Sequence, residues 1–111
     1  MTLISPSAFA DLREMSGDEL LNELIDVFLE DGPTMIAAMH AALATHDVDA
    51  FRRNAHSMKS NADTFGATDL AEHARALEVM ARAGNLDVGD RLDMLRGAYL
   101  AASDELRGMR T

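Results

Sequence analysis

The residues of this chain best suited to chemistry lie between Ala55 and Ala67, in the segment AHSMKSNADTFGA. A neutral imidazole on an exposed helix face is a nucleophile near neutral pH, and His56 is such a candidate. Lys59 follows three residues later, so on a helix its ammonium group reaches oxygens of any group attached to the ring. Ser60 and Ala55 are small and leave room for a partner's active site. The segment therefore contains a nucleophile, open access and a cation of the kind that would stabilise the charge on a transferring phosphoryl group.

A helix must position these side chains. Asp47 is suited to cap its start, and Gly66 to close it. The side chains one helical turn away from His56 are polar, which predicts that the imidazole lies on the exposed flank of the helix, next to the buried face. The buried face is predicted from apolar residues that alternate spacings of four and three: Phe51, Ala55, Met58, Ala62 and Phe65.

Two helical segments are expected before this one. Ser5 followed by Pro6 is typical of an N-cap and a first helical position, so a short opening helix is predicted to run to about Met15. The segment Ser16–Glu19 then matches a capping box, with serine at the N-cap and glutamate three residues later. A long helix is therefore predicted to start there.

Pro33 lies inside this long helix. Proline lacks the N–H that bonds back four residues, and its ring crowds the carbonyl of Leu29, so a break is the default expectation. The helical phase of the apolar residues nevertheless continues across the proline, which favours one long kinked helix to about Thr45. Its apolar face is predicted to contain Leu21, Leu24, Phe28, Met35, Met39 and Ala42.

Two more apolar helical patterns follow. One ends at Gly84, a suitable residue for a helix C-cap, and contains Leu70, Ala74, Leu77 and Ala81. The other follows Asp87 and contains Val88, Leu92, Leu95, Tyr99, Ala102, Leu106 and Met109. Four long helices with short connections predict an all-α fold: an antiparallel up-and-down four-helix bundle with a short extra N-terminal helix, forming a single domain over residues 1–111.

Composition limits the classes of partner. The 111 residues carry a formal net charge of -9 with a pI near 4.7, which disfavours nucleic acid and anionic membranes. There is no cysteine, as is compatible with the cytoplasm, and no apolar run long enough to span a membrane. We therefore expect a cytoplasmic monomer whose partner is another protein. No metal site is expected from His40, His46 and His73, and His73 is expected to pair with Asp69.

The motif around His56 resembles that of the histidine phosphotransfer (HPt) domain family. The family pattern H-x-[LIM]-K-G-x-[SA]-x-x-[hydrophobic]-G-A-x-x-L is matched from His56 to Leu70, and a Leu-Glu pair, Leu77 and Glu78, lies further on. Within the motif, Ala62, Phe65, Gly66 and Ala67 are interpreted as structural residues. Gly66 and Ala67 are explained by packing, since a side chain at the helix end would obstruct the turn into the third helix. Ser60 replaces the usual glycine but is still small.

The resemblance implies a phosphorelay carrier phosphorylated on His56, with Lys59 stabilising the phosphoryl group. Its partners would be receiver domains of response regulators or of hybrid histidine kinases, which supply the Mg²⁺, so the chain itself needs no cofactor and has no kinase activity. The alternatives are the N-terminal histidine domain of a chemotaxis-type kinase, or a helical adaptor that carries no phosphate. A start at Met1 and an end soon after the fourth helix favour a free-standing protein over the kinase domain.

Receiver docking is expected on the side of the second helix that carries His56. The residues predicted to take part are Arg52, Arg53, Lys59, Ser60 and Asp63, together with apolar groups of the first long helix. Because the chain is acidic overall, the basic residues among these are predicted to form an isolated basic patch that meets an acidic receiver surface.

Overall fold

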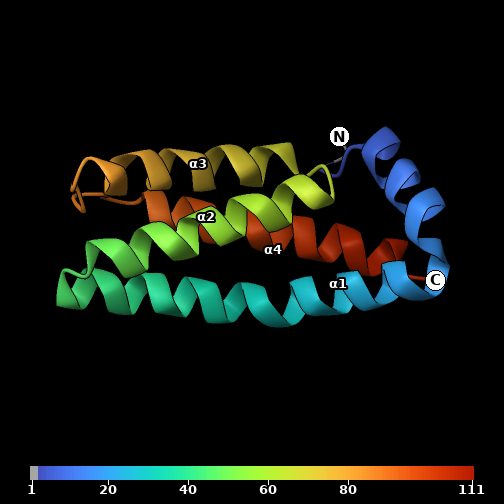
Figure 1. The fold of residues 1–111 in the computed structure, drawn as a ribbon, viewed down its shortest axis with the longest axis horizontal. Coiled ribbons are helices and arrows are strands. Elements are labelled where there is room, and N and C mark those ends of the chain that lie inside the picture. The colour runs from blue at the N-terminus through green and yellow to red at the C-terminus, as the bar shows by residue number, and fades with distance from the viewer. Residues whose placement is uncertain (1–2) are drawn as a thin grey trace.

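The computed structural model describes residues 3–111 and contains four helices. They are α1 (Pro6–Thr45), α2 (Val48–Thr64), α3 (Thr68–Arg82) and α4 (Arg91–Met109). Consecutive helices run in opposite directions, and each helix packs against its two neighbours, with α4 returning to α1 (Figure 1). The predicted antiparallel up-and-down four-helix bundle is confirmed. Within residues 3–111 no helix is both long and apolar enough to cross a membrane.

The opening helix predicted before Met15 forms the first part of α1. Ser5 caps it by accepting a hydrogen bond from the Ala8 N–H. The chain changes direction at Gly17, whose φ of 78° and ψ of 162° lie outside the helical region, and the opening segment crosses one end of the bundle (Figure 1). The predicted capping box is wrong, because Ser16 still belongs to the opening helix and its hydroxyl donates to the carbonyl of Leu12 at 2.6 Å.

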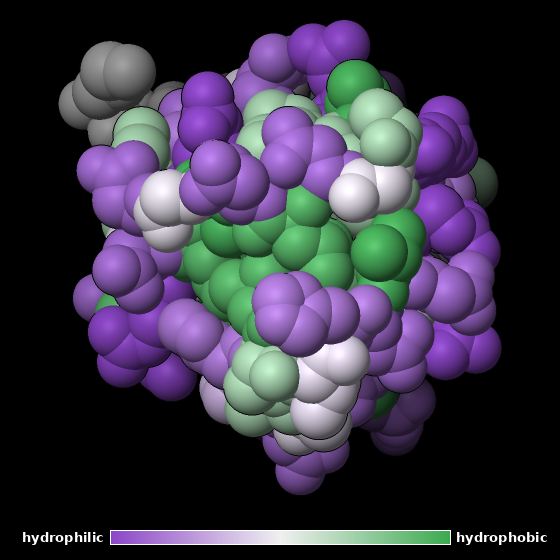
Figure 2. Space-filling model, turned by 90° about the vertical axis from the view of Figure 1, so that its left-hand side faces the viewer, coloured by the Kyte–Doolittle hydropathy of each residue, from purple (hydrophilic) through white to green (hydrophobic). Residues whose placement is uncertain are grey.

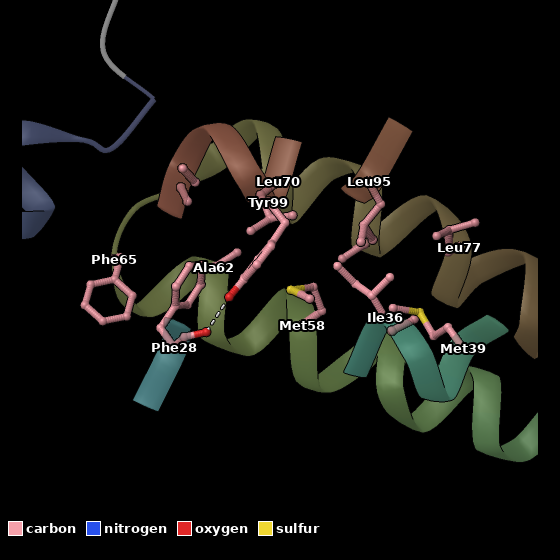
Figure 3. Packing of buried hydrophobic residues seen from close by; sticks show 14 of the residues in the cluster. Phe28, Ile36, Met39, Met58, Ala62, Phe65, Leu70, Leu77, Leu95 and Tyr99 are labelled. Atoms are coloured by element: carbon pink, nitrogen blue, oxygen red, sulfur yellow. Dashed lines mark hydrogen bonds between the residues drawn. The ribbon is translucent and has the colours of Figure 1, made fainter. Parts of the chain in front are cut away.

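After Gly17, α1 continues through Pro33 to Thr45 with helical backbone angles, so the continuous helix is confirmed and the bend lies at Gly17 rather than at the proline. Pro33 leaves the Leu29 carbonyl without its usual donor. The Tyr99 hydroxyl of α4 donates to the carbonyl of Phe28 at 2.7 Å (Figure 3). It also lies 3.3 Å from the carbonyl of Leu29, to which it donates as well. A side chain at Gly32 would overlap the Tyr99 ring, so glycine is required for this contact.

The core lies along the centre of the bundle and contains the predicted faces of α2 and α3 (Figure 3). In α1 the prediction was partly wrong: Ile25, Gly32 and Ile36 are buried, while Leu24 and Met35 are only partly buried because they line grooves toward α2. The fourth helix begins later than predicted. Val88 is buried but lies in the α3–α4 connection, where Gly89 has a φ of 57° that delays the helix to Arg91.

The two ends of the bundle differ. The opening segment of α1 covers one end, where its residue Phe9 and Ile4, just before the helix, are buried. Figure 2 shows the opposite end, where hydrophobic side chains gather in a hollow with a hydrophilic rim. The hollow lies between the α1–α2 and α3–α4 connections and is lined by Leu43, His46, Val48, Gly84, Asn85, Leu86 and Asp87.

Candidate functional site

His56 lies near the middle of α2 on its exposed flank. The helix is fixed at its start by Asp47, whose carboxylate accepts a hydrogen bond from the Ala50 N–H at 3.0 Å. Ala55 and Met58, on either side of His56 in the sequence, are fully buried and set the rotation of the helix. The His56 side chain is 52% exposed. A partner can therefore reach the ring from solvent while the helix beneath it is anchored in the core.

A buried glutamate of α3, Glu78, lies beneath His56. Its side chain is only 1% exposed, although glutamate is rarely buried without partners. Its Oε2 accepts hydrogen bonds from His56 Nδ1 at 2.7 Å and from Arg82 at 3.0 Å, and its Oε1 accepts one from Lys59 Nζ at 2.7 Å. These four residues are called the Glu78 cluster below. It joins the predicted pair, His56 and Lys59, through a carboxylate that the sequence analysis named as part of the family resemblance but did not place at the site.

The Glu78 carboxylate is ionised near neutral pH. Burial acts to raise the pKa of Glu78, but hydrogen bonds from Lys59 and His56 and the charges of Lys59 and Arg82 outweigh burial, so the pKa lies below its usual value. An ionised carboxylate can only accept hydrogen bonds. The proton in the contact with the imidazole is therefore assigned to His56 Nδ1.

This assignment decides which ring nitrogen is reactive. In a neutral imidazole one nitrogen carries the proton and the other keeps its lone pair. With the proton of His56 on Nδ1, the lone pair belongs to Nε2. Glu78 therefore orients the ring and selects its tautomer, as a carboxylate does behind a catalytic histidine. The arrangement suits nucleophilic attack by His56 Nε2 on an electrophile presented from solvent.

Lys59 lies where its spacing from His56 predicted, but its ammonium group is bound. It is 23% exposed and bonded to Glu78, the same carboxylate that holds the imidazole. Arg82, four residues after Glu78 on α3, is 59% exposed and supplies a second cation that the sequence reasoning did not consider. The sequence signals for these partners are the Leu77–Glu78 pair of the family resemblance and an arginine one turn after Glu78.

The residues predicted to dock a receiver are not brought together as an isolated basic patch. Arg52 and Arg53 both pair with Asp49, at 2.8 and 3.5 Å, and the pKa of Asp49 is lowered by the hydrogen bond from Arg52 and the charge of Arg53. That prediction is wrong, because an acidic residue in the first turn of α2 neutralises part of the charge. Ser60 and Asp63 are exposed further along the same helix.

The four structural residues of the motif, Ala62, Phe65, Gly66 and Ala67, are buried and support the end of α2. Ala62 and Ala67 lie in the core, and the Phe65 ring meets Phe28 edge-on, with centroids 5.3 Å apart. Gly66 has a φ of 68°, and its carbonyl accepts a hydrogen bond from the Ser5 N–H at 2.9 Å.

The reason for glycine at position 66 differs from the prediction. A Cβ there would lie 2.7 Å from the Cβ atoms of Ser5 and Ala8, so the obstructed element is the opening segment of α1, rather than the turn into α3. Of the other histidines, His73 pairs with Asp69 at 3.8 Å, as expected. Among the described residues, no three His, Cys, Asp or Glu side chains are grouped so as to hold a metal ion.

Comparisons with known proteins show which family the chain resembles. A family model described as the Hpt domain matches residues 23–107. Among solved structures, the chain is similar to histidine-containing phosphotransfer protein B (HptB) from Pseudomonas aeruginosa PAO1, with a TM-score of 0.90 and 29% sequence identity. The match covers 96% of this chain and 93% of that one. A search of curated proteins gave no significant match.

Proposed function

This chain belongs to the Hpt domain family and is a histidine phosphotransfer protein of a phosphorelay, and we propose that Nε2 of His56 is the atom that carries the phosphoryl group. The observation that carries this proposal is the 2.7 Å contact between His56 Nδ1 and the buried Glu78 carboxylate. It keeps the proton on Nδ1 and leaves the lone pair on Nε2.

The proposed donor is the phospho-aspartate of a receiver domain. The Nε2 lone pair attacks phosphorus, the P–N bond forms, and the bond from phosphorus to the aspartyl oxygen breaks so that the carboxylate leaves. The ring keeps its Nδ1 proton and becomes positively charged as the bond forms. Glu78 stabilises that charge, because it is an ionised acceptor already in contact with Nδ1–H. Transfer to a second receiver reverses these steps.

Lys59 supports the same transfer. A transferring phosphoryl group carries negative charge on its oxygens, which a nearby ammonium group stabilises. Lys59 is held against the carboxylate that also binds His56, so its ammonium group is close to the reacting ring. We assign the Mg²⁺ that the reaction requires to the receiver, and we assign no kinase activity to this chain. The chain acts as a phosphocarrier.

The receiver is proposed to cover α2 around His56 together with the adjacent face of α1. Val27 of α1 is 48% exposed and lines a groove with Asn61 and Thr64 of α2, which supplies an apolar centre next to polar side chains. Such a transient contact is expected to bury less than about 1,200 Å² in total. Arg53, Ser60 and Asp63 are exposed and are proposed to form part of its rim.

Receiver domains charged with radiolabelled acetyl phosphate test this proposal. The parent chain is expected to take up label in an acid-labile, base-stable form, and the His56→Gln variant is expected to take up none while keeping its helical circular dichroism. Labelled ATP is expected to transfer nothing to either chain. Binding of receivers by the parent without any uptake of label would support the adaptor instead, and label on His56→Gln would place the phosphoryl group elsewhere.

A further inference from the structure

The ammonium group of Lys59 is already committed to a partner before any phosphoryl group arrives. It binds Glu78 Oε1 at 2.7 Å, and that carboxylate is 1% exposed. The ammonium group has three N–H donors, but as it moves toward phosphoryl oxygens on the solvent-facing Nε2 of His56, its contact with the buried Oε1 lengthens and weakens. A buried carboxylate oxygen that loses its donor is costly, so Glu78 opposes the movement of Lys59.

Arg82 is placed to remove this cost. Its guanidinium group donates to Glu78 Oε2 at 3.0 Å from one turn further along α3. A guanidinium presents several N–H donors in a planar fork that fits both oxygens of a carboxylate. We propose that Arg82 is a positioning residue, which takes over both oxygens of Glu78 and thereby frees Lys59 for the phosphoryl group. This inference rests on the proposed phosphorylation of His56.

The charges of the Glu78 cluster fit this exchange. Before transfer, the Glu78 carboxylate faces the cations of Lys59 and Arg82. In the reactive form of the cluster, in which the His56 ring keeps the lone pair needed for attack, this leaves one excess positive charge. Transfer adds a phosphoryl group of charge about −2, and the ring that keeps its Nδ1 proton becomes +1. The product is then balanced. Without Arg82 it would hold one uncompensated negative charge, and Lys59 would be shared between two anionic groups.

Each partner in the exchange is accounted for. The P–N bond forms at His56 Nε2, the bond from phosphorus to the donor's leaving atom breaks, and no proton leaves His56 Nδ1 or Lys59. Lys59 exchanges one acceptor, Glu78 Oε1, for a phosphoryl oxygen. Arg82 gains that carboxylate oxygen as a second acceptor. Dephosphorylation returns Lys59 to Glu78, so Arg82 acts in both directions of transfer.

Potassium phosphoramidate, a small phosphoryl donor that requires no receiver, tests the inference. The rate of phosphoryl uptake is measured by phosphorus NMR for the parent and for Arg82→Gln, Arg82→Lys and Arg75→Gln. Arg75 is the matched control, because it lies on the same helix, is 59% exposed as Arg82 is, and pairs with Glu72 outside the cluster. Thermal unfolding is recorded for every variant, so that a loss of fold is recognised.

Arg82→Gln is expected to lower the uptake rate about tenfold, because one unsatisfied contact to a charged group costs a free energy of that order. Arg82→Lys is expected to be intermediate, since an ammonium group cannot span both oxygens. Arg75→Gln is expected to match the parent. In a Glu78→Gln background Arg82→Gln is expected to cost nothing further, because a neutral amide no longer holds Lys59.

Two outcomes overturn the inference while leaving the proposed function intact. One is uptake on His56 that is equally fast in the parent and in Arg82→Gln. The other is an equal effect of Arg82→Gln on the uptake rate in the parent and in the Glu78→Gln background. That result would mean that Arg82 acts on the phosphoryl group directly. A parent chain that takes up no phosphoryl group at His56 from phosphoramidate or from receivers overturns both proposals.

Discussion

Replacing Glu78 by glutamine tests how much the buried carboxylate contributes to phosphoryl transfer. Glutamine preserves the shape of the side chain and its ability to accept one hydrogen bond from His56 Nδ1, but it removes the negative charge beneath the ring. A hydrogen bond to a charged group is worth about 1.5–3 kcal/mol and one between neutral groups about 1 kcal/mol. This difference in hydrogen-bond free energy applies in the transition state, where the ring becomes positive. It corresponds to roughly tenfold slower uptake by Glu78→Gln than by the parent.

The assay is single-turnover uptake from phosphoramidate, with nitrogen NMR of the imidazole as a second readout. The parent is expected to show one tautomer with the proton on Nδ1, and Glu78→Gln a mixture. Glu72→Gln is the control, because Glu72 is an exposed carboxylate on the same helix that pairs with Arg75. A Glu78→Gln variant with the parent's rate and the parent's tautomer would refute the role assigned to Glu78.

The parent and the Glu78→Gln variant are also expected to differ in how their stability depends on pH. The pKa of Glu78 is lowered in the folded chain, despite burial, by its contacts with Lys59, His56 and Arg82. Its ionised form therefore adds stability above the pKa of an unfolded glutamate, about 4.3, and this contribution is lost as pH falls through the lower folded-state pKa. The difference in unfolding free energy between parent and Glu78→Gln is expected to shrink on acidification, and a difference that grows would contradict it.

Three further variants test the fold and the docking surface. Tyr99→Phe removes the donor to the Phe28 and Leu29 carbonyls and is expected to lower the unfolding free energy by about 1–2 kcal/mol in urea titrations, whereas an unchanged midpoint would show that the bond adds nothing. Gly66→Ala combines a φ of 68° with contacts to Ser5 and Ala8, so a loss of about 2–3 kcal/mol and faster amide exchange in the opening segment are expected. Arg53→Glu is expected to weaken receiver binding most at low salt, with an unchanged transfer rate in the preformed complex; equal binding at all salt concentrations would remove Arg53 from the interface.

The helices were predictable because each carries its own apolar periodicity. In α2 the buried positions Phe51, Ala55 and Met58 agree with the pattern read from the sequence, and they fix the exposed flank where His56 lies. The continuity of α1 across Pro33 was also recognised from phase alone. The hydrogen bond that compensates for the proline could not be recognised in this way, because its donor, Tyr99, is 70 residues away from Leu29 in the sequence.

The contacts of the site were harder to foresee. Glu78 is 22 residues from His56, and only the packing of α2 against α3 brings the two side chains together. An apolar pattern shows which face of a helix is buried, but it does not show that a charged residue at the edge of that face will be enclosed by cations from two helices. The pairing of Arg52 with Asp49 is different, because these residues are three apart on the same helix and the patch was inferred from the basic residues without counting this acidic neighbour.

The identity of the phosphorylated atom tests the central claim most directly. The parent chain is charged by a phosphorylated receiver and its imidazole nitrogens are observed by phosphorus and nitrogen NMR under alkaline conditions, where phosphohistidine is stable. We predict a single phosphohistidine, at His56, with phosphorus bonded to Nε2 while the Glu78 contact at Nδ1 remains. Phosphorus bonded to Nδ1, or to any residue other than His56, would contradict the account.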